Sequence, residues 1–175
     1  EWRDMAVLCK GGNALKILTA GLDAVGVPYV LTRGKNYYQR QEVVDLASAL
    51  RIATRPRVSD WYAFLRSAFV NLPPASIKEI VKHEEDRFAF VRDHYPQVWQ
   101  RILELRKIAA RHPADVLADL AHERLIDGMS FMETLALPAR DNVTHLVRVL
   151  SRSEPASVSH LIDELDRLSA QTEAS

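Results

Sequence analysis

Apolar residues recur at helical spacing through nearly all of the chain after residue 40. The clearest stripe is Val98, Ile102, Leu105 and Ala109, which fall on one face of a single helix. The same spacing predicts successive amphipathic helices over residues 41–54, 60–69, 76–92, 96–111, 114–126, 140–151 and 158–170. No segment in this region has the alternating pattern of a strand. The sequence therefore predicts a multi-helix domain here.

The first forty residues follow a different pattern. Short apolar runs at residues 5–9 and 27–31 predict two strands. Leu15, Leu18 and Leu22 predict a helix between them. Parallel strands joined by a helix are normally covered on both faces and have further neighbours. The expected fold class is mainly α with a small α/β portion, an incomplete parallel β-α-β unit followed by a multi-helix domain.

The segment Arg55-Pro56-Arg57 marks the predicted seam between these two parts. Proline is common at the junctions of secondary-structure elements because it cannot continue a helix. We expect one segment over residues 1–57 and a helical domain over residues 58–175. The chain begins at Glu1, with no initiator methionine, and almost directly enters an apolar run. We expect it to be a fragment of a larger protein.

Composition limits the classes of partner. The 23 basic residues are balanced by 23 acidic residues, so no global field attracts nucleic acid or an anionic membrane. Any contact with DNA must be local. The single cysteine, Cys9, excludes an internal disulfide and fits a reducing compartment. With no apolar stretch of transmembrane length and no signal-peptide pattern, a cytoplasmic setting and no membrane partner are expected.

No catalytic residue and no metal site is predicted. Gly11-Gly12 resembles a phosphate loop only by position, because the lysine and hydroxyl that such a loop needs after its glycines are absent. Residues 83–86, His-Glu-Glu-Asp, would fan out around a helix axis and are read as a solvated face. Asp163 and Glu164 are likewise read as surface residues, and Cys9 as a buried thiol.

Basic residues cluster at two places. Arg51, Arg55 and Arg57 run from the end of one predicted helix into the seam. A second set decorates another helix: Arg101, Arg106, Lys107 and Arg111. The first cluster is the better candidate for contacts with phosphate, which require cations on one accessible face. Ordinary solvated arginines that interact with a helix C-terminus remain an equal alternative.

The segments "DMAVLCK" and "GVPYVLTRGKNYYQRQEVVDLASALRI", with a helix between them, resemble the superfamily 1 helicases of the UvrD/Rep and RecB/AddA group. That group has a strand, a helix, a Pro-Tyr pair, a glycine turn and a motif of two aromatic residues, arginine and carboxylates that runs into Leu-Arg. The matching positions are Pro28, Tyr29, Gly34, Tyr37, Tyr38, Arg40, Glu42, Val43, Asp45, Leu50 and Arg51.

Weaker similarity continues downstream. The segment "AFLRSAFVNLPPASI" is similar to a pattern of the RecB/AddA helicase-nuclease branch, with Ala68 in place of the usual proline and Asn71 in place of the usual glycine. The segment "RDNVTHLVRVLSRSEPASVSHLIDELDRL" is similar to the end of the family's helical 2B insertion. The resemblance thus implies part of the second motor domain, 2A, together with the inserted 2B domain.

The resemblance also implies a function for the intact parent. It would be an ATP-dependent DNA helicase for repair and recombination, which uses ATP and Mg and acts on single-stranded and duplex DNA. An enzyme of the exonuclease V type is one form of this parent. This chain has no Walker motif, so we expect no cofactor and no ATP hydrolysis in it. A helicase-nuclease subunit is a further possible partner. The alternative is a helical module that binds a partner subunit rather than DNA.

Residue roles follow from the same resemblance. Arg51 corresponds to the arginine that contacts the backbone of the tracking single strand, and Ala49 replaces the aromatic residue that often precedes it. Arg40, Glu42 and Asp45 are read as a clamp that caps the helix, in preference to a direct contact between Arg40 and DNA, because a carboxylate repels phosphate. Tyr37 and Tyr38 are then mainly packing residues, with base contact as the lesser alternative.

Overall fold

The computed structural model describes residues 5–7, 9, 12–27, 29, 37–125 and 127–173. Helices dominate this part, as the sequence predicted. The helices are α1 Gly12–Ala24, the 3-10 helix η2 Tyr37–Gln39, α2 Gln41–Ala53, α3 Val58–Arg66, α4 Pro74–Lys82, α5 Arg87–His94, α6 Pro96–Ala109, α7 Pro113–Ala121, α8 Phe131–Thr134, α9 Leu137–Ser151 and α10 Val158–Glu173. None of those in the described residues combines the length and apolar character needed to cross a membrane.

The small α/β portion is not confirmed. Helix α1 forms where a helix was predicted, but residues 5–7, 9, 27 and 29 lie in no strand. The other members of the two predicted strands, and Gly34 of the motif, lie outside the described residues. A strand is stable only when its backbone N–H and C=O groups pair with a neighbour. Among the described residues, the two apolar runs have no such ladder.

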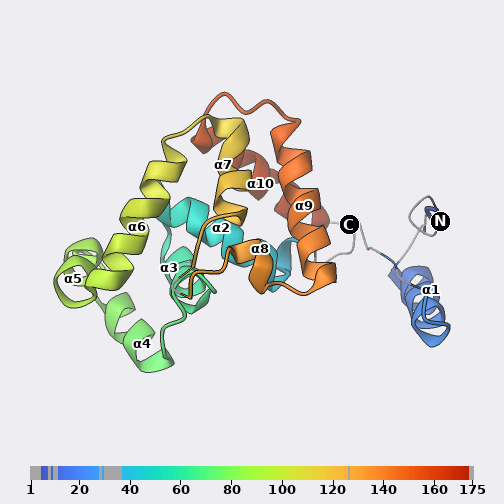
Figure 1. Ribbon diagram of the computed structural model, residues 1–175, viewed down its shortest axis with the longest axis horizontal. Helices are drawn as coiled ribbons and strands as arrows, with labels where there is room; N and C mark the ends of the chain where they lie inside the picture. Colours follow the sequence, from blue (N-terminus) through green and yellow to red (C-terminus); the bar gives the residue numbers. More distant parts are fainter. Residues whose placement is uncertain are drawn as a thin grey trace.

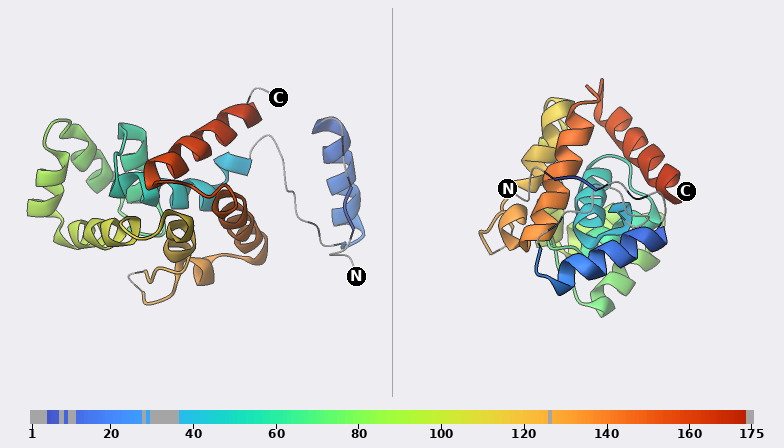
Figure 2. Two further views of the ribbon diagram at one scale, coloured as in Figure 1. Left: turned by 90° about the horizontal axis from the view of Figure 1, so that it is seen from above. Right: turned by 90° about the vertical axis from the view of Figure 1, so that its right-hand side faces the viewer.

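Helix α1 stands apart from the other helices (Figures 1 and 2). Ile17 of α1 is 76% exposed, and Val25, which directly follows the helix, is 71% exposed. Leu15, Leu18 and Leu22 of α1 are partly buried. All of the buried apolar residues of the described chain belong instead to the body formed by η2 and α2–α10. The hydrophobic core that positions the candidate site lies in that body.

Helix α2 runs through the middle of the helical body (Figure 1) and packs against α3, α6, α7, α9 and α10. Every residue from Asp45 to Leu50 is buried. The small side chains of Ala47, Ser48 and Ala49 let neighbouring helices approach on several sides, as expected of a helix that is enclosed all round. The predicted boundary at residue 57 follows α2, and α2 packs closely with the helices on the other side of it.

The predicted helix over residues 76–92 is wrong, because two helices occupy this region. Helix α4 ends at Lys82 and α5 begins at Arg87. Residues 83–86, expected on one helix, form the turn between them. The break is held by Arg87, whose Nη2 donates to the carbonyl of Val81 at 2.9 Å, and by the ring of His83, which stacks on Phe90 at 3.7 Å. Four consecutive polar residues have no apolar side chain to hold a continuous helix against the core.

Candidate nucleic-acid interface

The three arginines of the predicted phosphate-binding cluster lie together where α2 leads into α3. Arg51 lies in the last turn of α2, Arg55 follows that helix, and Arg57 is the residue before α3. The backbone N–H of Arg57 donates to Asp60 Oδ2 at 2.8 Å and so begins α3. Cations at a helix C-terminus are favoured by the helix dipole. Local sequence thus places the cluster at the end of the central helix.

Two aspartates of α10 pair with this cluster. Asp166 contacts two of the arginines, with its Oδ1 2.5 Å from Arg51 Nη2 and its Oδ2 2.6 Å from Arg57 Nη2. Asp163 Oδ1 lies 2.7 Å from Arg55 Nη2. Helix α10 therefore supplies a carboxylate oxygen to each arginine of the cluster.

The arginines differ in how far solvent can reach them. The side chain of Arg51 is 17% exposed, whereas those of Arg55 and Arg57 are 64% and 67% exposed. Arg51 Nη1 also lies 3.6 Å from Asp60 Oδ1, and its Nε has no hydrogen-bond partner among the described residues. Arg51 thus joins α2, α3 and α10, while Arg55 and Arg57 face solvent.

The charges of this cluster shift the pKa values of its members. Partial burial acts to raise the pKa of Asp166, but Arg51 and Arg57 outweigh it and lower that pKa below its ordinary value. The hydrogen bond to Asp166 raises the pKa of Arg57 further above its already high value. Asp166 and Arg57 are therefore charged at neutral pH.

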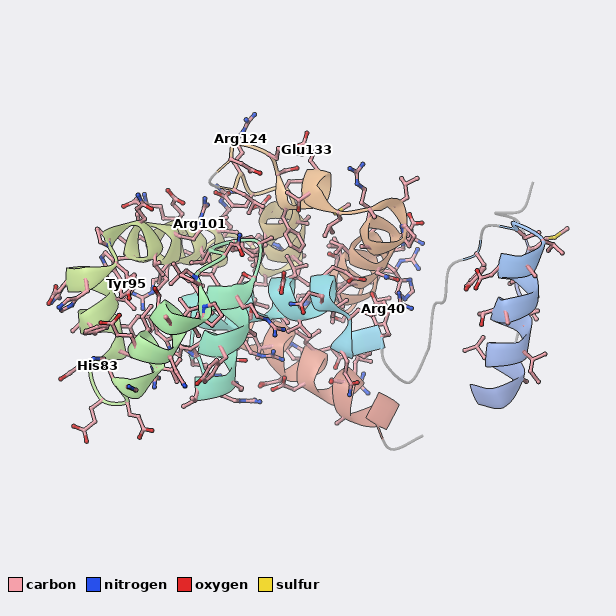
Figure 3. The ribbon with its side chains drawn as sticks, turned by 90° about the horizontal axis from the view of Figure 1, so that it is seen from below. Arg40, His83, Tyr95, Arg101, Arg124 and Glu133 are labelled. Carbon is pink, nitrogen blue, oxygen red and sulfur yellow. The ribbon has the colours of Figure 1, made fainter. Side chains whose placement is uncertain are left out.

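Arg40 is not brought together with the other three arginines. It precedes α2, and its backbone carbonyl accepts hydrogen bonds from Val43 and Val44 at 3.0 and 2.9 Å. Its side chain makes no capping hydrogen bond, because a guanidinium has only donors and a helix N-terminus needs an acceptor. The capping expected of Arg40 is therefore not observed. Figure 3 shows Arg40 at the start of α2. Arg51 lies in the last turn of that helix, about 16 Å further along its axis.

Tyr37 is a packing anchor. It is 3% exposed, and its hydroxyl donates to the main-chain carbonyl of Asn142 on α9 at 2.7 Å. Its ring makes edge-to-face contacts with Tyr38 and His145, with centroids 4.9 and 5.7 Å away. Burial raises the pKa of the Tyr37 phenol well above its usual range. Tyr38 is partly buried and packs against the same core.

Glu42 and Asp45 connect α2 to other elements. Glu42 Oε1 accepts from Asn142 Nδ2 at 2.7 Å, which joins α2 to α9. Asp45 Oδ1 accepts from Gln41 Nε2 at 2.5 Å, and its Oδ2 accepts from the backbone N–H of Ala68 at 3.3 Å. Burial raises the pKa of Asp45, partly offset by these hydrogen bonds. Both carboxylates thus accept hydrogen bonds from neighbouring groups, while the clamp role stays a prediction.

Three residues that complete these contacts were not predicted. Asn142 is buried and joins Tyr37 to Glu42, while Asp163 and Asp166 oppose the arginine cluster. Asp163 had been assigned to ordinary surface. The one available signal was the spacing of the two aspartates, three positions apart and hence on one face of a helix. Nothing in the sequence showed which helix that face would meet.

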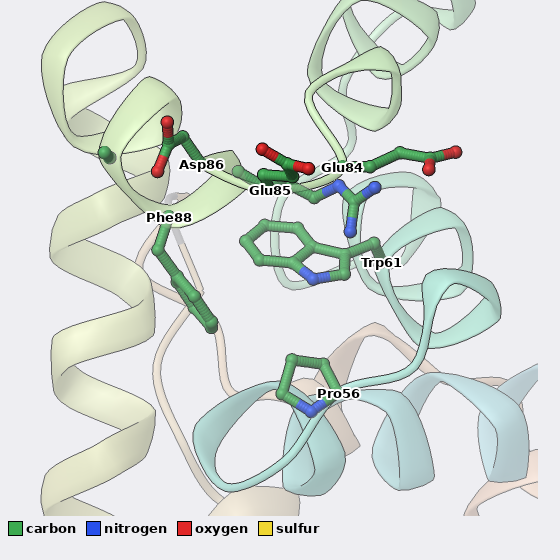
Figure 4. A pocket seen from close by; sticks show the side chains of 8 residues that line it. Pro56, Trp61, Glu84, Glu85, Asp86 and Phe88 are labelled. Atoms are coloured by element: carbon green, nitrogen blue, oxygen red, sulfur yellow. The ribbon is translucent and has the colours of Figure 1, made fainter.

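The turn that contains His83 carries three acidic residues in succession. Glu84, Glu85 and Asp86 line a shallow hollow bordered by Trp61 and Phe88 (Figure 4). No group of three histidine, cysteine or acidic residues within the described chain is arranged to hold a metal ion.

Comparison with known proteins identifies the relatives of this chain. The ATP-dependent DNA helicase Rep of Salmonella typhimurium is 24% identical over 144 residues, which is 70% of this chain and 21% of that protein. Rep of Escherichia coli is 32% identical over 85 residues, or 46% of this chain and 12% of that protein. Rep of Buchnera aphidicola subsp. Acyrthosiphon pisum is 32% identical over 77 residues, or 44% of this chain and 11% of that protein. The chain is similar to Rep helicases of superfamily 1.

This similarity confirms the UvrD/Rep resemblance. The chain spans about a fifth or less of the length of these Rep relatives. No family model matches the chain, and no solved structure matches it. Assignment to the RecB/AddA branch stays a prediction.

Proposed function

We propose that this chain is the part of a Rep-like, ATP-dependent DNA helicase that comprises a portion of domain 2A and the inserted 2B domain. The observation that supports this most is similarity to helicase Rep over as much as 70% of the chain. A parent of the RecB/AddA helicase-nuclease type is the finer form of the proposal, and it depends on the segment over residues 63–77. This chain would contribute DNA contacts and regulation, while ATP and Mg would act in other parts of the parent.

The proposed DNA contacts centre on the arginine cluster. A guanidinium makes paired, charge-assisted hydrogen bonds with phosphate oxygens wherever it is held in position. Arg55 and Arg57 are exposed and held near each other by the start of α3. Arg51, the residue that corresponds to the family's strand-contacting arginine, lies deeper and orients the cluster. Arg40 would make a separate contact at the other end of α2.

Binding of a forked DNA as a function of salt tests this function. For every phosphate that the protein no longer neutralises, the slope of log K against log salt should become shallower by about 0.7 to 0.9. The double substitution Arg55→Ala/Arg57→Ala should therefore weaken binding and flatten that slope. Arg111→Ala is a matched control, since Arg111 is 59% exposed and paired with Asp119 outside the cluster. Equal effects of both variants would mean that the cluster does not bind phosphate specifically.

The second candidate is a protein-interaction module. Exposed apolar side chains at α1 favour it, because Ile17 of that helix and Val25, which follows it, are each more than 70% exposed. The balanced net charge is also suited to this role. Tight, salt-insensitive binding to a helicase-nuclease subunit, without salt-dependent DNA binding, would support this function over the first. Substitution of Ile17 by Glu would then abolish partner binding.

A further inference from the structure

Asp163 and Asp166 form an acidic pair on α10 that faces the arginine cluster. They are three positions apart, so their side chains leave the helix on one face. Together they place a carboxylate oxygen within 2.7 Å of a nitrogen of each of Arg51, Arg55 and Arg57. A third acidic residue nearby, Glu164, pairs instead with Arg167. Of these three acidic residues of α10, Asp163 and Asp166 contact the arginine cluster and Glu164 does not.

We infer that the acidic pair is a built-in competitor of nucleic-acid phosphate for the arginine cluster, and this inference rests on the proposed function. Carboxylate and phosphate present similar oxygen acceptors to a guanidinium. Asp163 and Asp166 already occupy one guanidinium nitrogen of each arginine, which a phosphate oxygen could otherwise take. An incoming strand therefore has to displace carboxylates as well as counterions.

Repulsion adds to this competition. Asp166 is charged at neutral pH and contacts two of the arginines, so a phosphate bound at either one would lie close to an anion. The apparent affinity of the cluster for DNA is consequently lower than three arginines alone would give. A strand must therefore make enough contacts to offset the free energy of displacing the two carboxylates.

Competition takes place at the side chains, with α10 remaining docked. Leu161, Ile162 and Leu165 anchor this helix in the core and are at most 2% exposed. Removing them from the core would cost much more than breaking an exposed ion pair. Arg55 and Arg57 can turn outward from their partners, because each is more than 60% exposed. Arg51 stays in place and keeps Asp166 near the cluster.

Neutral, isosteric variants of the acidic pair test this inference. The double variant Asp163→Asn/Asp166→Asn removes two negative charges that face the cluster. The matched control, Asp119→Asn/Glu164→Gln, removes two charges that pair with Arg111 and Arg167. Affinity for a fluorescent oligothymidylate is measured at several salt concentrations. The first variant should bind about threefold to tenfold more tightly than wild type, and the control should change by less than about twofold.

The outcomes separate the inference from the proposed function. Equal affinities of the two double variants, with binding that is salt-dependent and weakened by Arg55→Ala/Arg57→Ala, would overturn the acidic pair as a competitor and leave DNA binding intact. Absence of salt-dependent binding in wild type and every variant would overturn both. Circular dichroism checks the fold of each variant. The single change Asp163→Asn alters only an exposed pair, and it should still tighten binding by about twofold to threefold.

Discussion

Asn142 of α9 donates its side-chain amide to Glu42 of α2 at 2.7 Å, although the two residues are 100 positions apart in the sequence. The main-chain carbonyl of the same asparagine accepts the hydroxyl of Tyr37. One buried residue thus holds both the aromatic pair and the carboxylate at the start of the central helix. The aromatic-arginine motif is fixed in the fold by a partner that lies in the last third of the chain.

Removing that partner should destabilise the helical body. Asn142→Ala deletes a buried amide and leaves Glu42 without its hydrogen bond, so the free energy of unfolding should fall by about 1–3 kcal/mol. Urea unfolding followed by circular dichroism measures this change. Thr144→Ala on the exposed face of α9 is the control and should change stability by less than about 0.5 kcal/mol. Equal stabilities of Asn142→Ala and the control would show that the bond adds nothing.

Local sequence was sufficient for most of the helices because each buries one apolar face. The stripe of Val98, Ile102 and Leu105 predicted α6 within two residues of its observed ends. Local sequence was insufficient where contacts between side chains determine the end of a helix. The break before Arg87 falls in the polar run of residues 83–86, but it also depends on the Val81 carbonyl and on the stacking of His83, which no sequence pattern shows.

Prediction of the candidate site was limited in the same way. The arginine cluster was found because Arg51, Arg55 and Arg57 are neighbours in sequence. Its carboxylate partners are not, since the pairs made by Asp163 and Asp166 span more than a hundred positions. An amphipathic pattern indicates which face of a helix is polar. It does not show which charged residues of another helix that face will contact, because this depends on how the helices pack. The pairing of Asp163 and Asp166 with the arginine cluster could therefore be recognised only from the fold.

Stability should depend on pH through Asp166. Its pKa is lower in the folded chain than the ordinary value of about 3.9, so its contribution to stability is present above that value and is lost as the pH falls through the folded pKa. The difference in free energy of unfolding between wild type and Asp166→Asn should be largest at neutral pH and should close in acid. Asp45, with its raised pKa, acts in the opposite direction in both proteins and cancels in the difference. A difference that stays constant across this range would contradict the prediction.

Arg87 should act through packing more than through its charge. It is 7% exposed, its guanidinium lies 5.7 Å from the centre of the Trp61 ring, and its Nε has no hydrogen-bond partner among the described residues. Arg87→Met keeps most of the volume and removes a costly buried charge, so stability should stay within about 1 kcal/mol of wild type. Arg87→Ala also removes the packing and should cost about 1–3 kcal/mol. Thermal unfolding of both variants measures the two effects, and a large decrease in the methionine variant would show that the hydrogen bond to Val81 dominates.

Helix α8 should depend on one buried ring more than on its cap. Four residues are too few for a stable helix, yet Phe131 is fully buried and stacks on Phe69 with ring centroids 4.9 Å apart. Ser130 and Glu133 form a reciprocal capping box on the exposed side. Phe131→Ala should lower the free energy of unfolding by about 3–5 kcal/mol, whereas Ser130→Ala should lower it by about 0.5–2 kcal/mol. Urea unfolding of both variants gives the order, and a larger decrease for Ser130→Ala would show that α8 is held by its local hydrogen bonds instead.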